Sequence, residues 1–364
     1  MNRIRTIAAL LVIALIACVI PGYADAKGVA YADPVEIVAY LKSRTNRLDE
    51  EISFSYSAEM DEYFADSDFL QQTLHNDFAV SYRWRIDNKS RSVYVTQIKY
   101  NPGFRAANAD RIGRPDLLDE RELQILEIAK SIVAEAQAQC DNLLSLEKYL
   151  HDEICRRTTY KESPYEPGDE GFTTYDTAFG VLLYGEAECD GYSDTFYLLG
   201  TLAGLNVGLL CGCTESSGIG HIWNLVEINR EWYHVDVTWD DLDDEDDALI
   251  SYRFMNVTSD YLYDHSWVTQ YFNSYPLAEE MNWAAYVYSS QQFGLYAKDE
   301  TAAGQQVAAL YKSGVREFNF MIDGTSFDSD SFGKALGNAG VRTRYTYYSR
   351  EPIGNYICLD MKAE

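Results

Sequence analysis

Three residue types that could carry out nucleophilic catalysis follow one another between positions 189 and 236. Cys189, His221 and Asp236 lie in the segments Gly-Glu-Ala-Glu-Cys-Asp-Gly-Tyr-Ser, Gly-Ile-Gly-His-Ile-Trp-Asn and Trp-Tyr-His-Val-Asp-Val-Thr-Trp. A thiol nucleophile needs a base that takes its proton, and the base needs a third group that fixes its tautomer. In this order Cys189 would be the nucleophile, His221 the general base and Asp236 the orienting carboxylate.

The thiol must be presented by a helix for this chemistry to work well. Residues 189–203 place apolar side chains at helical spacing, which predicts that Cys189 begins a helix. The unpaired amides of a first helical turn stabilise a thiolate and lower its pKa. The acidic side chains of Glu186, Glu188 and Asp190 would oppose this effect if they pointed at the sulfur.

The base and the carboxylate must lie on one face of a hairpin. Residues 221–228 and 232–239 are predicted to be two consecutive strands. A slip of one residue in their register would send Asp236 to the opposite face. His234 shares the face of Asp236 by the period of two, so it is the rival base.

These segments resemble the transglutaminase-like superfamily, which is related to the papain-like cysteine peptidases. Residues 189–192 fit its Cys-x-Gly-Tyr motif, 221–224 its His-x-Trp-Asn motif, 232–240 its acid-bearing motif and 252–256 its Tyr-x-Phe-x-Asn motif. The resemblance covers roughly residues 140–270. It implies an α+β fold in which a helix packs on an antiparallel sheet, with the triad in the roles given above.

Four further residues of these motifs are candidates for the substrate cleft. They are Tyr192, Trp223, Asn224 and Trp239. Core packing around the site is the favoured alternative for the tryptophans.

We expect no metal and no cofactor. Cys211 and Cys213 stand two positions apart, but no second pair of cysteines or histidines completes a zinc site. The acidic run 240–247 offers oxygen ligands for calcium, yet it lacks the EF-hand spacing with its glycine. A solvated loop is therefore the favoured interpretation of this run, and calcium is the weaker one.

The composition restricts the partners. The chain has 364 residues, an apolar content of 47% and a formal net charge of −27, with a pI near 4.5. Nucleic acids and anionic lipid surfaces both require a basic surface, so neither is expected to bind. A peptide, a protein or a cell-surface polymer is the expected substrate, and the oligomeric state stays open.

The first 26 residues are predicted to be a signal peptide. Arg3 and Arg5 precede an apolar run at 7–20, and the Ala-Asp-Ala sequence at 24–26 fits a signal-peptidase site. The protein is therefore expected to be secreted or held at the cell surface. A lipoprotein anchored through Cys18 is the alternative. After removal of this segment no apolar run is long enough to span a bilayer.

Two similar segments flank the predicted catalytic domain at 118–275. Residues 33–110 and 285–362 both read as a small module with the element order αβαββ. Each has an Asp-Ser-Asp sequence before its second helix, at 66–68 and 328–330, which we interpret as helix caps.

Three functions remain open. The leading hypothesis is an exported cysteine peptidase or amidase that forms a thioester, with hydrolysis favoured over the cross-linking reaction of a protein-glutamine acyltransferase. The alternative is a catalytically silent surface-binding or adhesion protein with the same fold. A minor third hypothesis is a metal-dependent hydrolase that uses His151, His221 and the acidic run 240–247.

Overall fold

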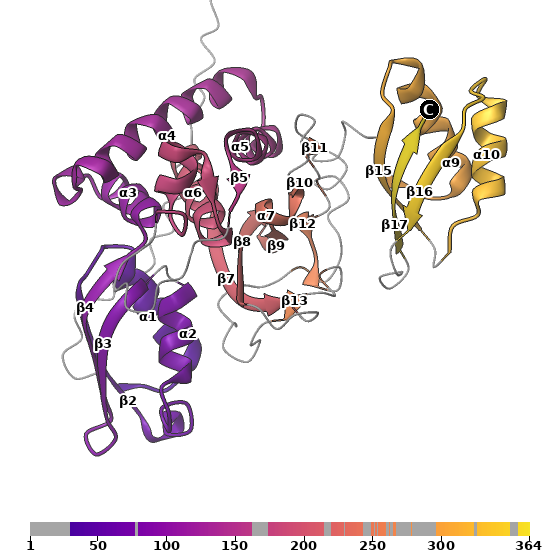
Figure 1. The fold of residues 1–364 in the computed structure, drawn as a ribbon. Coiled ribbons are helices and arrows are strands. Elements are labelled where there is room, and N and C mark those ends of the chain that lie inside the picture. The colour runs from indigo at the N-terminus through magenta and orange to yellow at the C-terminus, as the bar shows by residue number, and fades with distance from the viewer. Residues whose placement is uncertain are drawn as a thin grey trace, which may run out of the picture.

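The structure is a computed structural model of the 364-residue chain, drawn in Figure 1. The described residues are 30–76, 79–161, 174–214, 220–228, 230–242, 249–250, 252, 254–259, 262, 265–266, 278, 296–323, 326–349 and 356–364. The predicted signal peptide and most of the acidic run lie outside them.

The N-terminal elements form a four-stranded sheet of order β1-β2-β4-β3 with two helices. Strands β1 and β2 are parallel, and the other pairs are antiparallel. Strand β2 alternates along its length and buries Ile52, Phe54 and Tyr56. The elements are β1 (Ala30–Tyr31), α1 (Pro34–Thr45), β2 (Glu51–Tyr56), the short helix η1 (Ala58–Met60), α2 (Asp68–Asn76), β3 (Ala79–Asp87) and β4 (Ser92–Tyr100).

The C-terminal elements form a second four-stranded sheet, of order β14-β15-β17-β16. Its first pair is parallel and its other pairs are antiparallel, as in the N-terminal sheet. In both sheets the first strand has only two residues, too few for an alternation to be visible in the sequence. The elements are β14 (Tyr296–Ala297), α9 (Glu300–Lys312), β15 (Glu317–Asp323), α10 (Ser329–Asn338), β16 (Tyr345–Ser349) and β17 (Tyr356–Ala363).

The central elements combine helices with an antiparallel five-stranded sheet of order β12-β9-β8-β7-β13. The helices and the helical turn η3 precede this sheet in the chain. They are α3 (Pro102–Arg111), η2 (Pro115–Leu117), α4 (Glu120–Gln139), α5 (Leu143–Arg157), η3 (Gly180–Tyr184) and α6 (Cys189–Ala203). The strands and the last short helix are β7 (Val207–Thr214), β8 (Gly220–Ile228), β9 (Glu231–Val235), α7 (Val237–Asp240), β12 (Met255–Val257) and β13 (His265–Ser266). Two small pairs, β5 (Thr159–Tyr160) with β6 (Glu186–Ala187) and β10 (Asp241–Leu242) with β11 (Leu249–Ile250), complete the list.

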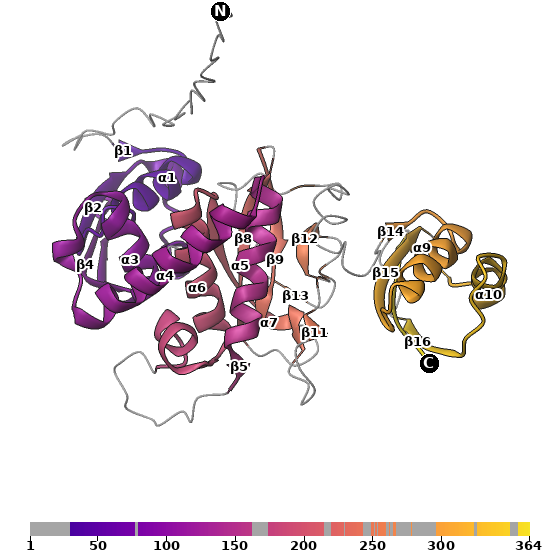
Figure 2. The same ribbon diagram turned by 90° about the horizontal axis from the view of Figure 1, so that it is seen from above.

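Helix α6 is the centre of this unit. It contacts α3, α4, α5 and strand β8 (Figure 2). Every residue from 191 to 200 is buried. Its buried Asp194 accepts the amide hydrogens of Gly103 and Phe104 at the start of α3, at 2.8 Å each, and that of Ala178 at 3.0 Å. These bonds supply partners for amides that a helix start leaves unpaired. Asp194 thereby fixes α3, a helix that the sequence analysis did not predict, against α6.

The predicted strand 232–239 is wrong in its second half. Strand β9 ends at Val235, and residues 237–240 form the short helix α7. The reason is local: the Asp236 carboxylate accepts the amide hydrogen of Trp239 at 3.2 Å and so caps the helix. Periodicity alone does not reveal this competition between a strand and a cap.

Among the described helices, none combines the length and the apolarity that crossing a bilayer requires.

Candidate active site

Cys189 is the first residue of α6, as the sequence predicts. The residue before it, Glu188, has an extended backbone and makes no side-chain capping bond to the first turn. The Cys189 thiol donates a hydrogen bond to Oδ2 of Asp190 at 3.6 Å. It also accepts a hydrogen bond from the backbone amide of Ile222, the residue after His221.

The electrostatics at the thiol differ from the expectation for a helix start. Burial raises the pKa of Cys189 well above its ordinary value, and the charges of Asp190, Asp236 and Glu188 raise it further. The bond from the Ile222 amide offsets only part of this rise. The thiol is therefore neutral in this state, and the prediction of a stabilised thiolate is wrong for it. Asp190 is the acid that points at the sulfur.

Asp190 itself is strongly affected by its surroundings. Burial, and next the charge of Asp176, raise the pKa of its carboxyl group to about 7. Glu186, by contrast, forms an ion pair with Lys161 at 2.6 Å.

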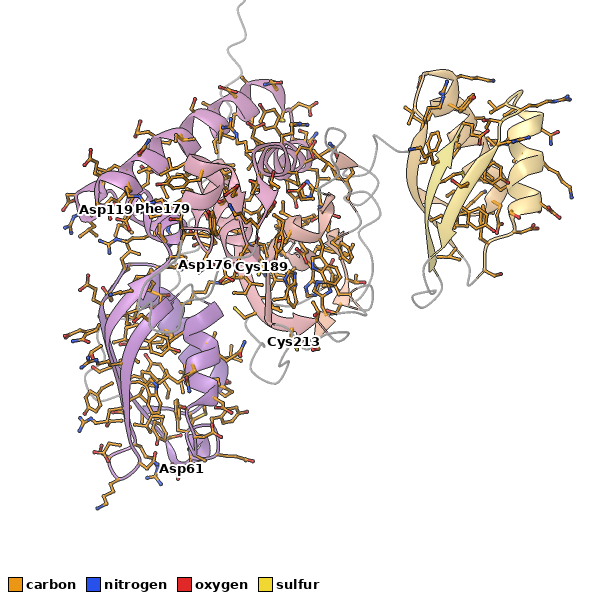
Figure 3. All side chains as sticks on the ribbon, viewed as in Figure 1. Asp61, Asp119, Asp176, Phe179, Cys189 and Cys213 are labelled. Atoms are coloured by element: carbon orange, nitrogen blue, oxygen red, sulfur yellow. The ribbon has the colours of Figure 1, made fainter. Side chains whose placement is uncertain are left out.

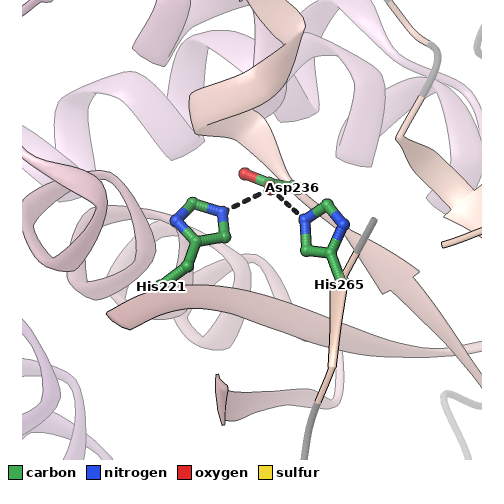
Figure 4. Close-up of side chains that lie close together, drawn as sticks. All are labelled: His221, Asp236 and His265. Atoms are coloured by element: carbon green, nitrogen blue, oxygen red, sulfur yellow. Dashed lines mark hydrogen bonds and ion pairs between the residues drawn. The ribbon is translucent and has the colours of Figure 1, made fainter. Parts of the chain in front are cut away.

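His221 and Asp236 are in direct contact. Nε2 of His221 lies 2.6 Å from Oδ2 of Asp236, and the two residues are 6% and 1% exposed (Figure 4). Strands β8 and β9 pair Asn224 with Val235, so that His221 and Asp236 lie on the same face of the hairpin, two positions apart diagonally. Burial alone would raise the pKa of Asp236, but the His221 and His265 rings more than offset it and hold it well below its usual range.

Helix α6 is attached to strand β8 next to the histidine. The Ser193 hydroxyl donates to the carbonyl of Ile222 at 3.1 Å, and the Asn224 side chain donates to the carbonyl of Ser193 at 3.1 Å. Within the described part of the chain, the hydrogen bonds of the thiol go to Asp190 and Ile222 and not to the His221 ring. In proteins without bound substrate, catalytic hydrogen bonds are often long and tighten only in the complex.

A second histidine touches the same carboxylate. Nε2 of His265 lies 3.1 Å from Oδ2 of Asp236, and the His265 side chain has no exposed surface. His265 is not recognisable from the local sequence, because β13 reaches the site by pairing with the distant strand β7. The one available signal was rarity, since the chain has only five histidines.

His234, the rival base, is enclosed. Its Nδ1 accepts the indole hydrogen of Trp223 at 2.9 Å, and its Nε2 lies 3.0 Å from the Ser259 hydroxyl. Burial, and next the charge of His265, lower its pKa to about 3. A base with so low a pKa and two occupied nitrogens cannot accept a proton from a thiol at neutral pH.

The four candidate cleft residues lie mainly in the core. Tyr192 and Trp223 have no exposed surface and Asn224 is 1% exposed, so these three cannot contact a substrate in this conformation. Asn224 instead holds backbone carbonyls of α6 and β7. Trp239 is half-buried and packs against the His221 ring, with 5.6 Å between ring centroids. Of the four candidates, Trp239 is the one whose side chain has exposed surface that a substrate could contact.

A cavity of about 600 Å³ opens between the N-terminal sheet and the start of α4. Among its lining residues are Lys99, Arg105, Asp119 and Phe179, of which the last two are labelled in Figure 3. None of the triad residues lines it.

Comparisons with known proteins complete the description. No family model and no curated protein matches the sequence. The chain is similar to a solved structure called a TGase, with 15% identity and a TM-score of 0.29, over 52% of this chain and 51% of that one. It is also similar to a protein from Cytophaga hutchinsonii described provisionally as a cysteine protease, with 12% identity and a TM-score of 0.26, over 43% of this chain and 61% of that one.

The matches thus span only about half and three fifths of those two chains. At these TM-scores the overlays carry no argument about this chain. Any conclusion about its chemistry must come from its own side chains.

Proposed function

We propose that this chain is an exported cysteine enzyme that acts on amide or peptide bonds through Cys189, His221 and Asp236. The His221–Asp236 pair carries the proposal. The pair is buried and joined by a 2.6 Å hydrogen bond. His221 is directly followed by Ile222, whose backbone amide donates a hydrogen bond to the Cys189 thiol. An imidazole oriented by a carboxylate beside a thiol is the arrangement that nucleophilic acyl transfer needs.

The proposed reaction proceeds through a thioester. The sulfur of Cys189 attacks the carbonyl carbon of the substrate while its proton passes to Nδ1 of His221. The carbon–nitrogen bond then breaks, and the leaving amine takes that proton from His221. A water molecule, deprotonated by the same ring, attacks the thioester, and the thiol regains its proton as the acid product leaves.

The raised pKa of Cys189 shapes the first step. Because the resting thiol is neutral, His221 must take the proton during the attack rather than hold it beforehand in an ion pair. The first turn of α6 has no side-chain cap, so the amide of Cys189 is a suitable donor for the oxyanion. This mechanism resembles that of a serine nucleophile with its base.

Hydrolysis is favoured over cross-linking. A cross-linking enzyme must exclude water and admit an amine, and no described residue points to such a channel. The net charge of −27 would attract cationic peptides or basic surface polymers.

Thiol labelling with peptide mapping tests the proposal. A thiol-directed activity probe should label Cys189, and Cys189→Ala should abolish both labelling and turnover of peptide amides. The matched control is Cys140→Ala, because Cys140 is also a partly exposed free thiol but bonds to the Ser145 carbonyl on α5. Turnover that persists in Cys189→Ala would refute the proposal.

A second candidate, a catalytically silent binding protein, is favoured by one observation. The thiol donates its hydrogen to Asp190, and its pKa is raised, which is the condition of an unreactive cysteine. The rate of iodoacetamide alkylation decides between the two. A Cys189 that reacts no faster than Cys140 would support the binding protein, whereas faster reaction that depends on His221 would support the enzyme.

A further inference from the structure

His265 has no role in a triad, yet it is built into the site. It lies on the edge strand β13, where it pairs with Thr214 of β7. Its ring is enclosed by aromatic side chains, with ring centroids 4.4 Å from Trp239, 4.9 Å from Trp223 and 5.8 Å from Phe254. An imidazole in such apolar surroundings is costly unless it makes a strong hydrogen bond.

The strong hydrogen bond is the one to Asp236. Oδ2 of Asp236 accepts hydrogen bonds from Nε2 of His265 at 3.1 Å and from Nε2 of His221 at 2.6 Å. Oδ1 receives the amide of Trp239 at 3.2 Å. The carboxylate is therefore held by three donors on two separate strands and one helix.

The tautomer of His265 follows from its other nitrogen. Nδ1 is buried and has no hydrogen-bond partner among the described residues. A hydrogen on that atom would be an unpaired buried donor, whereas a bare nitrogen costs less. An ionised carboxylate can only accept, so Nε2 of His265 carries a hydrogen.

A metal ion is the competing explanation for this cluster. Ligand atoms of His221, Asp236 and His265 all lie within 4.8 Å of one another, as in a two-histidine, one-carboxylate site. Figure 4, however, shows both rings directed at the same carboxylate, and both short contacts end on its Oδ2 atom. The point where the two nitrogens converge is thus occupied by the oxygen that they bind.

We propose that His265 is a positioning residue that holds Asp236 ionised and directed at Nε2 of His221. This inference rests on the proposed function and deepens it. With three donors, the carboxylate has little tendency to take the proton of the His221 ring. The proton that His221 accepts from the thiol then stays on that ring, where the leaving amine can collect it. Because His221 is held through its Nε2 atom, its Nδ1 atom is left to take the proton of the thiol.

Two substitutions separate positioning from packing. His265→Phe fills the aromatic cage but removes the donor, and His265→Gln keeps an N–H group near the position of Nε2. Loss of a hydrogen bond to a charged group should lower the alkylation rate of Cys189 and the turnover number by roughly 10- to 100-fold in His265→Phe. His265→Gln should recover most of this loss. Equal losses in the two variants would overturn the proposal.

Nuclear magnetic resonance of the histidine rings supplies a test that needs no turnover. Nitrogen-15 spectra of the wild-type protein should show His265 as the Nε2–H tautomer, and a far-downfield proton on Nε2 of His221 should shift in His265→Phe. An Nδ1–H tautomer would refute the inference. If Cys189→Ala left turnover intact while these signals appeared, the proposed function alone would fail.

The same spectra exclude or establish the metal. The ring signals should be unchanged after dialysis against a chelator. Signals that change on chelation, together with one equivalent of metal in the untreated protein, would overturn the positioning role in favour of ligation.

Discussion

The short helix α7 has an aspartate at each end, and each aspartate contacts a buried histidine in a different arrangement. Asp236, before the helix, is one carboxylate shared by two rings, those of His221 and His265. Asp240, at its end, is one of two carboxylates that share a single ring, that of His151.

The second cluster consists of His151, Asp152 and Asp240, and we call it closed because both nitrogens of its ring contact carboxylates. Burial alone would lower the pKa of His151, but Asp152 and Asp240 on its two nitrogens raise it to about 9. The ring is thus charged at neutral pH and both its nitrogens are occupied. Asp152 also takes the ammonium group of Lys148 at 2.6 Å.

The first cluster consists of His221, Asp236 and His265, and we call it open because one nitrogen of the His221 ring is not engaged by a carboxylate. His221 uses Nε2 for Asp236, and Nδ1 has no hydrogen-bond partner among the described residues. The same pair of residue types therefore serves two purposes. An imidazole with both nitrogens bound to carboxylates holds helices together, whereas an imidazole with one nitrogen free can move a proton.

The largest expected effect comes from breaking the open cluster. Asp236→Asn should lower turnover on the order of 10⁴-fold, because an amide cannot hold the His221 tautomer or stabilise its charged form. The counterpart Asp240→Asn should leave turnover in the wild-type range, with a loss of stability instead. Steady-state kinetics and urea unfolding of both variants test this contrast. Equal kinetic losses would mean that the two clusters do not divide their roles as described.

The next effect concerns stability. His151→Leu leaves Asp240 buried without its cation, whereas Asp152 keeps its ion pairs with Lys148 and Arg156. Removal of one partner of a buried charged pair costs about 3–5 kcal/mol of unfolding free energy. The matched control is His234→Leu, at an equally buried histidine that bonds a neutral indole and a neutral hydroxyl. There the loss should be about 1–3 kcal/mol, since the indole donor and the hydroxyl lose these bonds. Urea unfolding at pH 7 measures both, and a reversed order would contradict the charged state of His151.

Much of the scaffold of these clusters is visible in the sequence. Residues 118–139 and 143–157 are rich in leucine, isoleucine and alanine at helical spacing with interleaved acids, which predicts two helices, and the structure has α4 and α5 at those places. The start of α4 is also fixed locally, because Asp119 and Glu122 form a capping box. Local rules of this kind work because they depend on neighbours within one turn.

The parts that the sequence did not reveal depend on distant contacts or on a competition. His265 arrives through the pairing of β13 with β7, which no local pattern records. Asp236 was expected within a strand, but its side chain caps α7 and ends β9. The open cluster could thus be predicted in its His221–Asp236 half alone, through a family motif rather than through periodicity.

The smallest expected effect is a change in the pH dependence of stability, and it concerns Glu147, which lies near the closed cluster. Glu147 is 1% exposed, and Oε2 accepts a hydrogen bond from the Asn256 side chain at 3.2 Å, while Oε1 is buried and has no hydrogen-bond partner within the described part of the chain. Burial, opposed by Asn256 and His151, raises the pKa of Glu147 to about 7, against about 4.3 in an unfolded chain. The folded state therefore binds this proton more tightly, and its contribution to stability is lost as the pH rises through 7.

Glu147→Gln removes this titration, because an amide of the same shape carries no charge. The unfolding free energy of the wild-type protein should fall relative to that of Glu147→Gln between pH 5 and pH 8, by roughly 1–3 kcal/mol. His151 makes its own contribution to the pH dependence, because its pKa of about 9 in the folded state compares with 6.5 for an ordinary histidine, but both proteins contain this histidine and its contribution cancels in the difference between them. The control is Glu153→Gln on the same helix, at a partly exposed ion pair with Arg157, where the pH dependence should stay that of the wild type. Parallel curves for the wild type and Glu147→Gln would show that this carboxyl group is already ionised at pH 5, and the closed cluster would then hold one more negative charge than described.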